Sequence, residues 1–281
     1  MAFMKDTFVG TVPFDTTAIT YYDSDPESTD AQTIVLLHGT GGSAENNFWA
    51  LFPMLAMRHR VLALDFIDPE AGAVDGDYYL RQVRALVKQA AGRGAVHLVG
   101  YSFGAVIAAS YAACDDSSLA SLTLIAGWAK TDKQQQLRND VWRSLYESKH
   151  EALAGFSVLT SFSQAFLNAK NESELNGLLQ AVKNGPDRSV KMTFNRDVDI
   201  SDSLFDIAVP SLVIGCKHDQ MVPIRHSRML FGAIKDCRYA EINSGHGVVH
   251  ERPSELFNMI DMFVRDPLAL PAGETIENTH V

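Results

Sequence analysis

Eight strand-like segments recur along the 281-residue chain and limit its fold more than any other feature. Most of them are apolar throughout instead of alternating with polar residues, as is typical of parallel sheets covered on both faces. Segments with helical periodicity separate several of the strands. This alternation predicts an α/β fold with a doubly wound, mostly parallel eight-stranded sheet. The expected strands span residues 7–12, 17–23, 33–37, 60–64, 95–99, 121–125, 211–215 and 237–242.

The strand pattern lapses over residues 128–207, which contain helical segments instead. One helix is expected from Asn171, where Glu174 completes a capping box and Leu175, Leu178 and Leu179 share a face. We interpret residues 128–207 as a helical cap, or lid, over the strand ends. Residues 1–127 and 208–267 then form the core. The C-terminal segment 268–281 is rich in Pro, Glu and Thr, and we expect it to be loose.

Composition and charge narrow the choice of partners and compartment. The net charge is −10 and no basic cluster stands out, which argues against nucleic acid and anionic membrane surfaces as partners. The N-terminus has no long apolar run of the kind found in signal peptides. Cys114, Cys216 and Cys237 are odd in number and widely spaced. We therefore expect free thiols in a reducing cytoplasm. The sequence does not indicate an oligomeric state.

The stretch GYSFG, Gly100 to Gly104, contains the pattern G-x-S-x-G between a buried strand and a helix rich in small residues. Glycines two positions before and after Ser102 let the strand and the helix approach closely. The hydroxyl of Ser102 is then presented at the helix N-terminus, above the sheet edge. Because serine is a poor nucleophile by itself, it needs a nearby base and an acid that orients the base.

His246 is the candidate base because it lies between two glycines just past the last expected strand. His250 is its nearest rival and suits packing or capping better, whereas His97 falls inside a strand and is expected to be a core residue. The candidate acid is Asp219, a few residues beyond the strand at 211–215. Asp132 is the second choice.

The stretch HGTGGS, from His38 to Ser43, supplies a glycine-rich loop after the third strand. A phosphate-binding loop is disfavoured, since no G-K-[ST] or G-x-G-x-x-G pattern is present. The backbone amides of Thr40 and Phe103 are instead the candidate oxyanion donors. We expect His38 to orient the loop, and we also include it among the residues that could line a substrate pocket. Those residues are His38, Trp128, Trp142, Phe162 and Phe166.

Taken together, HGTGGS, GYSFG, VIGCKHDQMVP and GHGVVHERP resemble the α/β-hydrolase superfamily in their order and intervals. The resemblance extends over about residues 7–265. It implies a serine hydrolase with Ser102 as nucleophile, His246 as base and Asp219 as the orienting acid. It also implies oxyanion donors at Thr40 and Phe103.

These residues predict acyl transfer to water from a carboxylic ester, lactone or thioester of a small, largely apolar molecule, through an acyl-enzyme on Ser102. We expect no cofactor and no metal. Two other classes of function stay open: a biosynthetic acyltransferase, cyclase, lyase or cofactor-free oxygenase on the same scaffold, and a non-catalytic receptor for a small molecule. Fold alone does not separate these possibilities.

Overall fold

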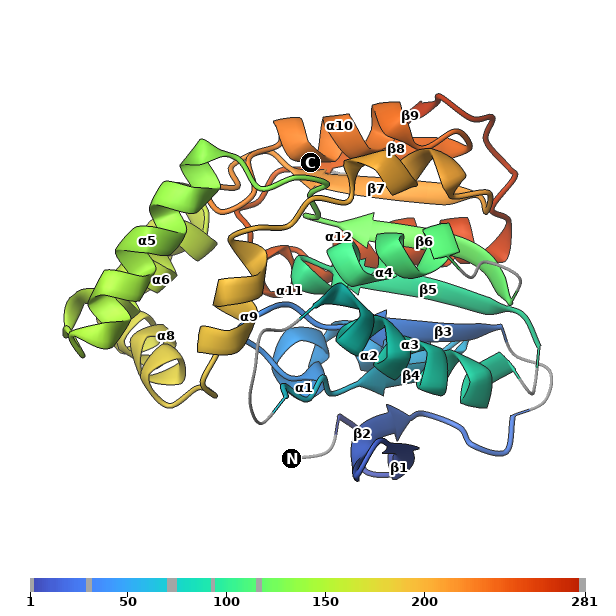
Figure 1. Cartoon of the computed structure of the whole chain (residues 1–281), viewed down its shortest axis with the longest axis horizontal. Coiled ribbons are helices and arrows are strands. Elements are labelled where there is room, and N and C mark those ends of the chain that lie inside the picture. The colour runs from blue at the N-terminus through green and yellow to red at the C-terminus, as the bar shows by residue number, and fades with distance from the viewer. Residues whose placement is uncertain (1–2, 29–31, 70–74, 92–93, 115–117, 278–281) are drawn as a thin grey trace.

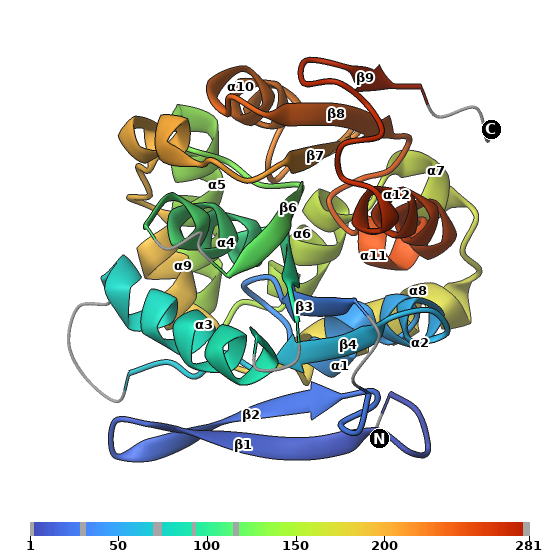
Figure 2. The same ribbon diagram turned by 90° about the vertical axis from the view of Figure 1, so that its right-hand side faces the viewer.

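The protein is described from a computed structural model, which covers residues 3–28, 32–69, 75–91, 94–114 and 118–277. Its centre is a nine-stranded sheet in the order β1-β2-β4-β3-β5-β6-β7-β8-β9. The first two strands form an antiparallel hairpin at one edge, and β3 to β9 run parallel (Figures 1 and 2). The strands are β1 (Phe8–Phe14), β2 (Thr17–Asp23), β3 (Thr33–Leu37), β4 (Arg60–Leu64), β5 (Val96–Tyr101), β6 (Leu119–Ile125), β7 (Ser211–Cys216), β8 (Cys237–Ile242) and β9 (Thr275–Ile276).

All eight expected strands are present, but the predicted count was wrong because β9 adds a ninth. This strand lies in the segment that we expected to be loose. It pairs with β8, and the N–H of Gly273 donates to the Cys237 carbonyl at 2.8 Å. The guanidinium of Arg238 also donates to the Leu270 carbonyl at 2.6 and 2.8 Å. Backbone pairing therefore orders a two-residue strand that has no apolar pattern of its own.

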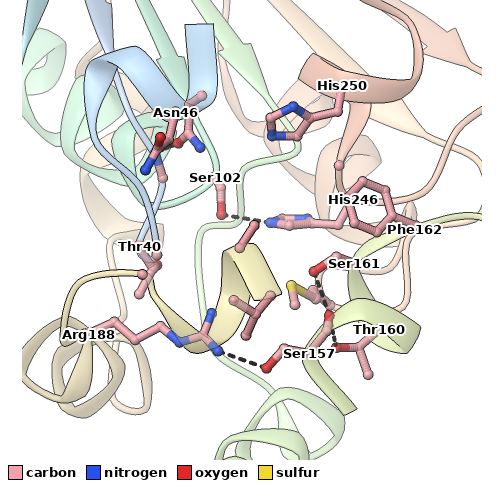
Figure 3. Close-up of a pocket in the computed structure, with 18 of the residues that line it drawn as sticks. Thr40, Asn46, Ser102, Ser157, Thr160, Ser161, Phe162, Arg188, His246 and His250 are labelled. Carbon is pink, nitrogen blue, oxygen red and sulfur yellow. Dashed lines mark hydrogen bonds between the residues drawn. The ribbon is translucent and has the colours of Figure 1, made fainter. Parts of the chain in front are cut away.

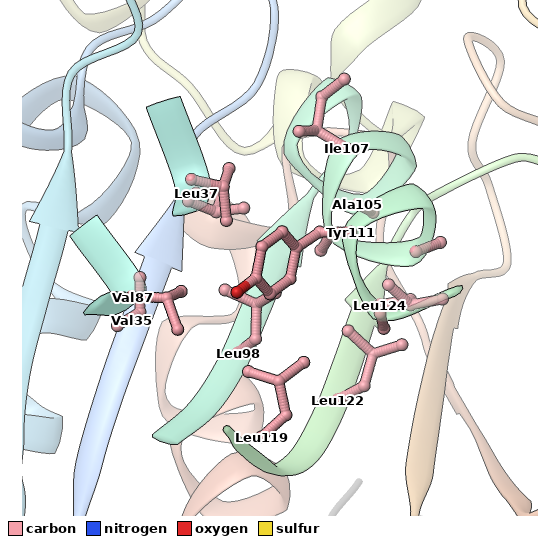
Figure 4. Close-up of a cluster of buried hydrophobic side chains, with 14 of the residues drawn as sticks. Val35, Leu37, Val87, Leu98, Ala105, Ile107, Tyr111, Leu119, Leu122 and Leu124 are labelled. Atoms are coloured by element: carbon pink, nitrogen blue, oxygen red, sulfur yellow. The ribbon is translucent and has the colours of Figure 1, made fainter. Parts of the chain in front are cut away.

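Helices cover both faces of the sheet, as the continuous apolar strands require. Along β3, Val35 and Leu37 pack into one buried cluster, whereas Ile34 and Leu36 pack into a second cluster on the opposite face. Figure 4 shows part of the first cluster, between the sheet and the helices on that side. That face carries α3 (Gly76–Ala91), α4 (Phe103–Cys114) and α10 (Arg225–Ala233); the other carries α1 (Ala44–Phe48), α2 (Leu51–Ala56), α11 (Val248–Glu251) and α12 (Pro253–Arg265).

The segment 128–207 is helical and lies beyond the carboxyl ends of the parallel strands (Figure 1). The capping box of its α8 helix is formed, since the Asn171 side chain accepts from the Glu174 N–H and the Glu174 carboxylate accepts from the Asn171 N–H, both at 3.0 Å. None of the helices in the described part of the chain is long and apolar enough to cross a bilayer. The segment comprises α5 (Lys133–Glu147), α6 (Ala152–Ser161), α7 (Gln164–Asn168), α8 (Glu172–Lys183), α9 (Ser189–Asn195) and the 3-10 helix η1 (Ser201–Asp206).

Candidate active site

Ser102 lies in a strained turn between β5 and α4, with a backbone φ of 55°. Few non-glycine residues adopt this conformation, and it is typical of functional turns. The flanking glycines are required by close packing, as expected. A Cβ on Gly100 would lie 2.3 Å from the Gly104 carbonyl oxygen, and a Cβ on Gly104 would lie 2.1 Å from the Leu37 carbonyl oxygen. The fold thus fixes the Ser102 hydroxyl at the carboxyl edge of the sheet.

The structure brings Ser102, His246 and Asp219 into one chain of hydrogen bonds. The distance from Ser102 Oγ to His246 Nε2 is 2.8 Å, and that from His246 Nδ1 to Asp219 Oδ2 is 2.7 Å. Asp219 Oδ1 accepts from the N–H groups of Met221 and Val222, each at 2.8 Å. The carboxylate is therefore held facing the imidazole. All three side chains are buried, so bulk water competes weakly with these contacts.

The alternative residues have other partners, although His250 lines the same cavity as Ser102 and His246. Asp132, the second candidate acid, caps α5 through Gln135 and faces His226 at 2.8 Å. His250 accepts a hydrogen bond from the indole of Trp49 at 3.1 Å. His97 is buried in β5, where the desolvation of its ring lowers its pKa to about 4. These positions confirm the packing role expected for His97 and leave His246 as the histidine that faces Ser102.

The loop that carries His246 is fixed to the segment 128–207. The Glu251 carboxylate accepts from the N–H of Ser163 at 2.8 Å, from the Ser163 hydroxyl at 2.6 Å and from the N–H of Gly245 at 3.1 Å. Gly247 donates from its N–H to the Ser161 carbonyl at 2.7 Å. A Cβ on Gly245 would lie 2.4 Å from the Ser163 nitrogen. These glycines are thus needed for close contact with the helical segment, rather than for freedom to bend.

Several hydrogen bonds hold the glycine-rich loop after β3 in place. His38 lies beneath it: its Nδ1 is 2.7 Å from the Gly39 carbonyl oxygen, and its Nε2 accepts from the N–H of Phe66 at 3.0 Å. Burial lowers the pKa of His38 to about 4, so the ring is neutral at pH 7. The N–H of Gly39 donates to Asn47 at 2.8 Å, and that of Gly42 donates to the Gly39 carbonyl. Among the described residues, the Thr40 N–H has no protein acceptor.

A cavity of about 960 Å³ lies between the strand ends and the helices of segment 128–207. Ser102 and His246 are on its wall (Figure 3). Trp128, Trp142, Phe162 and Phe166 line it, as predicted. Phe162 and Phe166 stack with ring centroids 4.8 Å apart. The prediction that His38 lines the pocket was wrong, because its ring is buried behind the loop with both nitrogens bonded to backbone.

Two arginines on the cavity wall, Arg138 and Arg188, were not identified from the sequence. A partial signal was present in α5, where Gln135, Asn139 and Trp142 recur at helical spacing and are buried, and Arg138 on the same helix is half-buried. Polar residues on the buried stripe of a helix suggest a polar cavity. The periodicity of α5 does not determine, however, whether its buried stripe faces the cavity or the protein core.

Comparisons with known proteins agree with this fold. The family described as "alpha/beta hydrolase fold" matches residues 32–253, so the chain belongs to the α/β-hydrolase family and is an enzyme of that family. The chain is 27% identical over 241 residues to pyrrolizixenacetamide deacetylase from Xenorhabdus hominickii. The matched region covers 82% of this chain and 90% of that protein.

Two solved structures show the same fold at low sequence identity. One is MGS-M2, an alpha/beta hydrolase from a Medee basin deep-sea metagenome library, with a TM-score of 0.81, 18% identity and coverage of 97% of this chain and 100% of that one. The other is the enol-lactonase from Burkholderia xenovorans LB400, with a TM-score of 0.77, 19% identity and coverage of 92% and 100%. The family match and the deacetylase relative support hydrolytic activity as the coarse assignment, and they leave the substrate unspecified.

Proposed function

We propose that the protein is a serine hydrolase that cleaves a carboxylic ester, lactone or thioester through an acyl-enzyme on Ser102. The observation that carries this proposal is the chain of hydrogen bonds from Ser102 through His246 to Asp219 on the wall of a large cavity. Because His246 lies between the other two residues, its imidazole can accept the serine proton. The carboxylate then orients the ring and stabilises the positive charge that forms on the imidazole. The name of the deacetylase relative, which also indicates acyl cleavage, fits the same chemistry.

The first half of the reaction forms a bond between Ser102 Oγ and the acyl carbon. His246 Nε2 takes the hydroxyl proton as the carbonyl oxygen becomes an oxyanion. The amides of Thr40 and Phe103 are the proposed donors to that oxygen. Phe103 is the first residue of α4, where the N–H has no partner within the helix, and the dipole favours negative charge. Loss of one such donor typically costs about 3–4 kcal/mol of barrier.

The tetrahedral adduct collapses when His246 returns its proton to the departing alcohol or thiol. A water molecule then gives a proton to His246 and attacks the acyl carbon. The bond from that carbon to Ser102 Oγ breaks as His246 returns the proton to Oγ, which releases the acid and restores Ser102. The aromatic side chains of the cavity wall suit the apolar part of a small substrate. The helical segment 128–207 acts in this proposal as the lid that shapes the pocket.

The test compares Ser102→Ala with the wild type in steady-state hydrolysis of p-nitrophenyl butyrate. We expect kcat to fall by a factor on the order of 10⁶, as for removal of another serine nucleophile, with an unchanged melting temperature. Ser148→Ala, an exposed serine at the end of α5, is the matched control and should keep wild-type activity. Retention of most of the activity by Ser102→Ala contradicts the proposal. A wild-type protein that binds the ester without turnover favours the receptor alternative.

A further inference from the structure

Two arginine side chains line the cavity, and neither has a carboxylate partner among the residues that the structure describes. Arg138 lies on α5, and Arg188 immediately precedes α9. Arg188 donates from Nη2 to the Ser157 hydroxyl at 2.7 Å, and its guanidinium lies 5.4 Å from the ring centroid of Trp142. Arg138 makes no hydrogen bond or ion pair with any residue that the structure describes, and its Nε is buried. These two cations therefore have unused donors.

Arg138 and Arg188 are half-buried, and more deeply buried cations of the same molecule are paired. Arg60 contacts Asp23 at 2.6 Å, and Lys191 contacts Asp68 at 2.6 Å. Removing a charge from water without a partner is costly, so charges in such places are usually paired, and an anionic ligand would supply the missing partner here. The carboxylate of Glu174 on the cavity wall cannot serve here, because it already binds Lys170 and caps α8.

The two guanidinium groups also act on each other. Burial lowers the pKa of Arg188 to about 10, and the positive charge of Arg138 lowers it in the same direction. Burial likewise lowers the pKa of Arg138, although the negative charge of Asp219 raises it. Two like charges beside one cavity repel each other, and an anion bound between them would relieve that repulsion.

The arginines lie close to the reaction centre. A Cβ on Gly41 would lie 2.9 Å from Arg188 Nη1, so the guanidinium touches the glycine-rich loop next to Thr40. Figure 3 shows Arg188 pointing into the cavity that Ser102 and His246 line. The indole N–H of Trp142 is a further buried donor on this wall with no acceptor among the described residues. The wall thus offers several donors to an acceptor-rich group.

We propose that Arg138 and Arg188 form an anion subsite, and that the substrate is an acyl compound that carries a carboxylate as well as the scissile carbonyl. Arginine suits a carboxylate because its planar fork donates two parallel hydrogen bonds. This inference rests on the proposed function, which supplies the reacting acyl group. It narrows the substrate class to acyl compounds that also carry a carboxylate. The rest of the substrate would lie against the aromatic side chains of the cavity.

The experiment uses matched pairs of esters that differ only in charge. Monomethyl succinate, glutarate and adipate are each compared with the corresponding methyl ester that ends in a primary amide. The ratio of kcat/KM for the acid to that for the amide is measured for each chain length. We expect the wild type to prefer the carboxylate by about tenfold or more at one chain length, as for other hydrogen bonds to charged groups. A ratio near or below one at every length overturns the proposal.

Variants then assign the preference to the two arginines. Arg138→Gln and Arg188→Gln should each lower the ratio at least severalfold, while Arg188→Lys should retain part of it because the charge remains. Arg196→Gln removes an arginine that pairs with Asp140 and does not line the cavity, and it should leave the ratio unchanged. Because the ratio is taken within each variant, a general loss of activity cancels. A preference that survives both glutamine variants contradicts the proposal.

Binding separates failure of this proposal from failure of the proposed hydrolase function. Quenching of tryptophan fluorescence reports binding of glutaramate, the monoamide of glutarate, against the neutral glutaramide, in Ser102→Ala as well as in wild type. Tighter binding of glutaramate that is lost in Arg188→Gln supports the subsite even if no ester is hydrolysed. Equal binding of the two compounds overturns it even if p-nitrophenyl butyrate is hydrolysed readily.

Discussion

Glu251 offers a sharp test of how the helical segment positions the proposed base. Its carboxylate accepts from the N–H groups of Ser163 and Gly245, and both of those residues are buried. In Glu251→Ala, both amides lose their acceptor. A buried N–H without an acceptor costs about 1–3 kcal/mol, so the two together should lower the free energy of unfolding by about 2–6 kcal/mol.

Glu251→Gln is the matched control. Its side-chain oxygen can still accept from both amides, and its NH₂ can donate to the Ser163 hydroxyl, which then acts as acceptor. We expect Glu251→Gln to lose less than about 1.5 kcal/mol, since only the charge is removed. In a chain of this size, each kcal/mol corresponds to about 2–4 °C in melting temperature, so calorimetry can separate the two variants.

The same substitution should change catalysis, because Gly245 precedes His246 directly in the chain. Displacement of the imidazole from Ser102 should lower kcat for p-nitrophenyl butyrate in Glu251→Ala by at least tenfold, with a smaller change in KM. The reasoning is refuted if Glu251→Ala keeps the wild-type melting temperature and kcat. It is equally refuted if Glu251→Gln is as damaging as Glu251→Ala.

Three further predictions concern the acid, the turn and a buried histidine. Asp219→Asn should fold normally but lower kcat by about 10⁴, because an amide favours the wrong tautomer of His246; steady-state kinetics and circular dichroism check this. Gly104→Ala should yield little folded protein in a solubility assay, since the new methyl group would lie 2.1 Å from the Leu37 carbonyl oxygen. Burial lowers the pKa of His97 to about 4, so the unfolded chain, with a pKa near 6.5, binds the proton more readily. Its contribution to stability is then present above about pH 6.5 and lost by up to about 3 kcal/mol as the pH falls to 4; the fall in melting temperature over this range should be smaller in His97→Leu.

The sheet and the turn at Ser102 were predictable because local sequence determines them. Strands buried on both faces must be apolar throughout. The contact of α4 with β5 tolerates only glycine at position 100, and its contact with the end of β3 tolerates only glycine at position 104. His246 and Asp219 could be found because each follows a recognisable strand. Parallel strands bring their carboxyl ends to one edge, so the residues that follow them converge.

Other features depend on contacts that are distant in the sequence. Strand β9 exists because the backbone of β8 offers it hydrogen bonds and Arg238 holds the preceding turn, so its own residues carry no signal. His38 follows a strand just as a pocket residue would, yet packing of the loop turns its ring inward. The orientation of Arg138 and Arg188 is set by how helices of segment 128–207 pack on the core, which helical periodicity alone does not determine.

The most direct test of the central claim is the site and rate of labelling by a p-nitrophenyl alkylphosphonate. We expect release of one equivalent of p-nitrophenol per chain and a single phosphonate adduct, located on Ser102 by tandem mass spectrometry. His246→Ala should react at least 10³-fold more slowly, because general-base activation of the serine is lost. An adduct on another residue, or equally fast labelling of His246→Ala, contradicts the account.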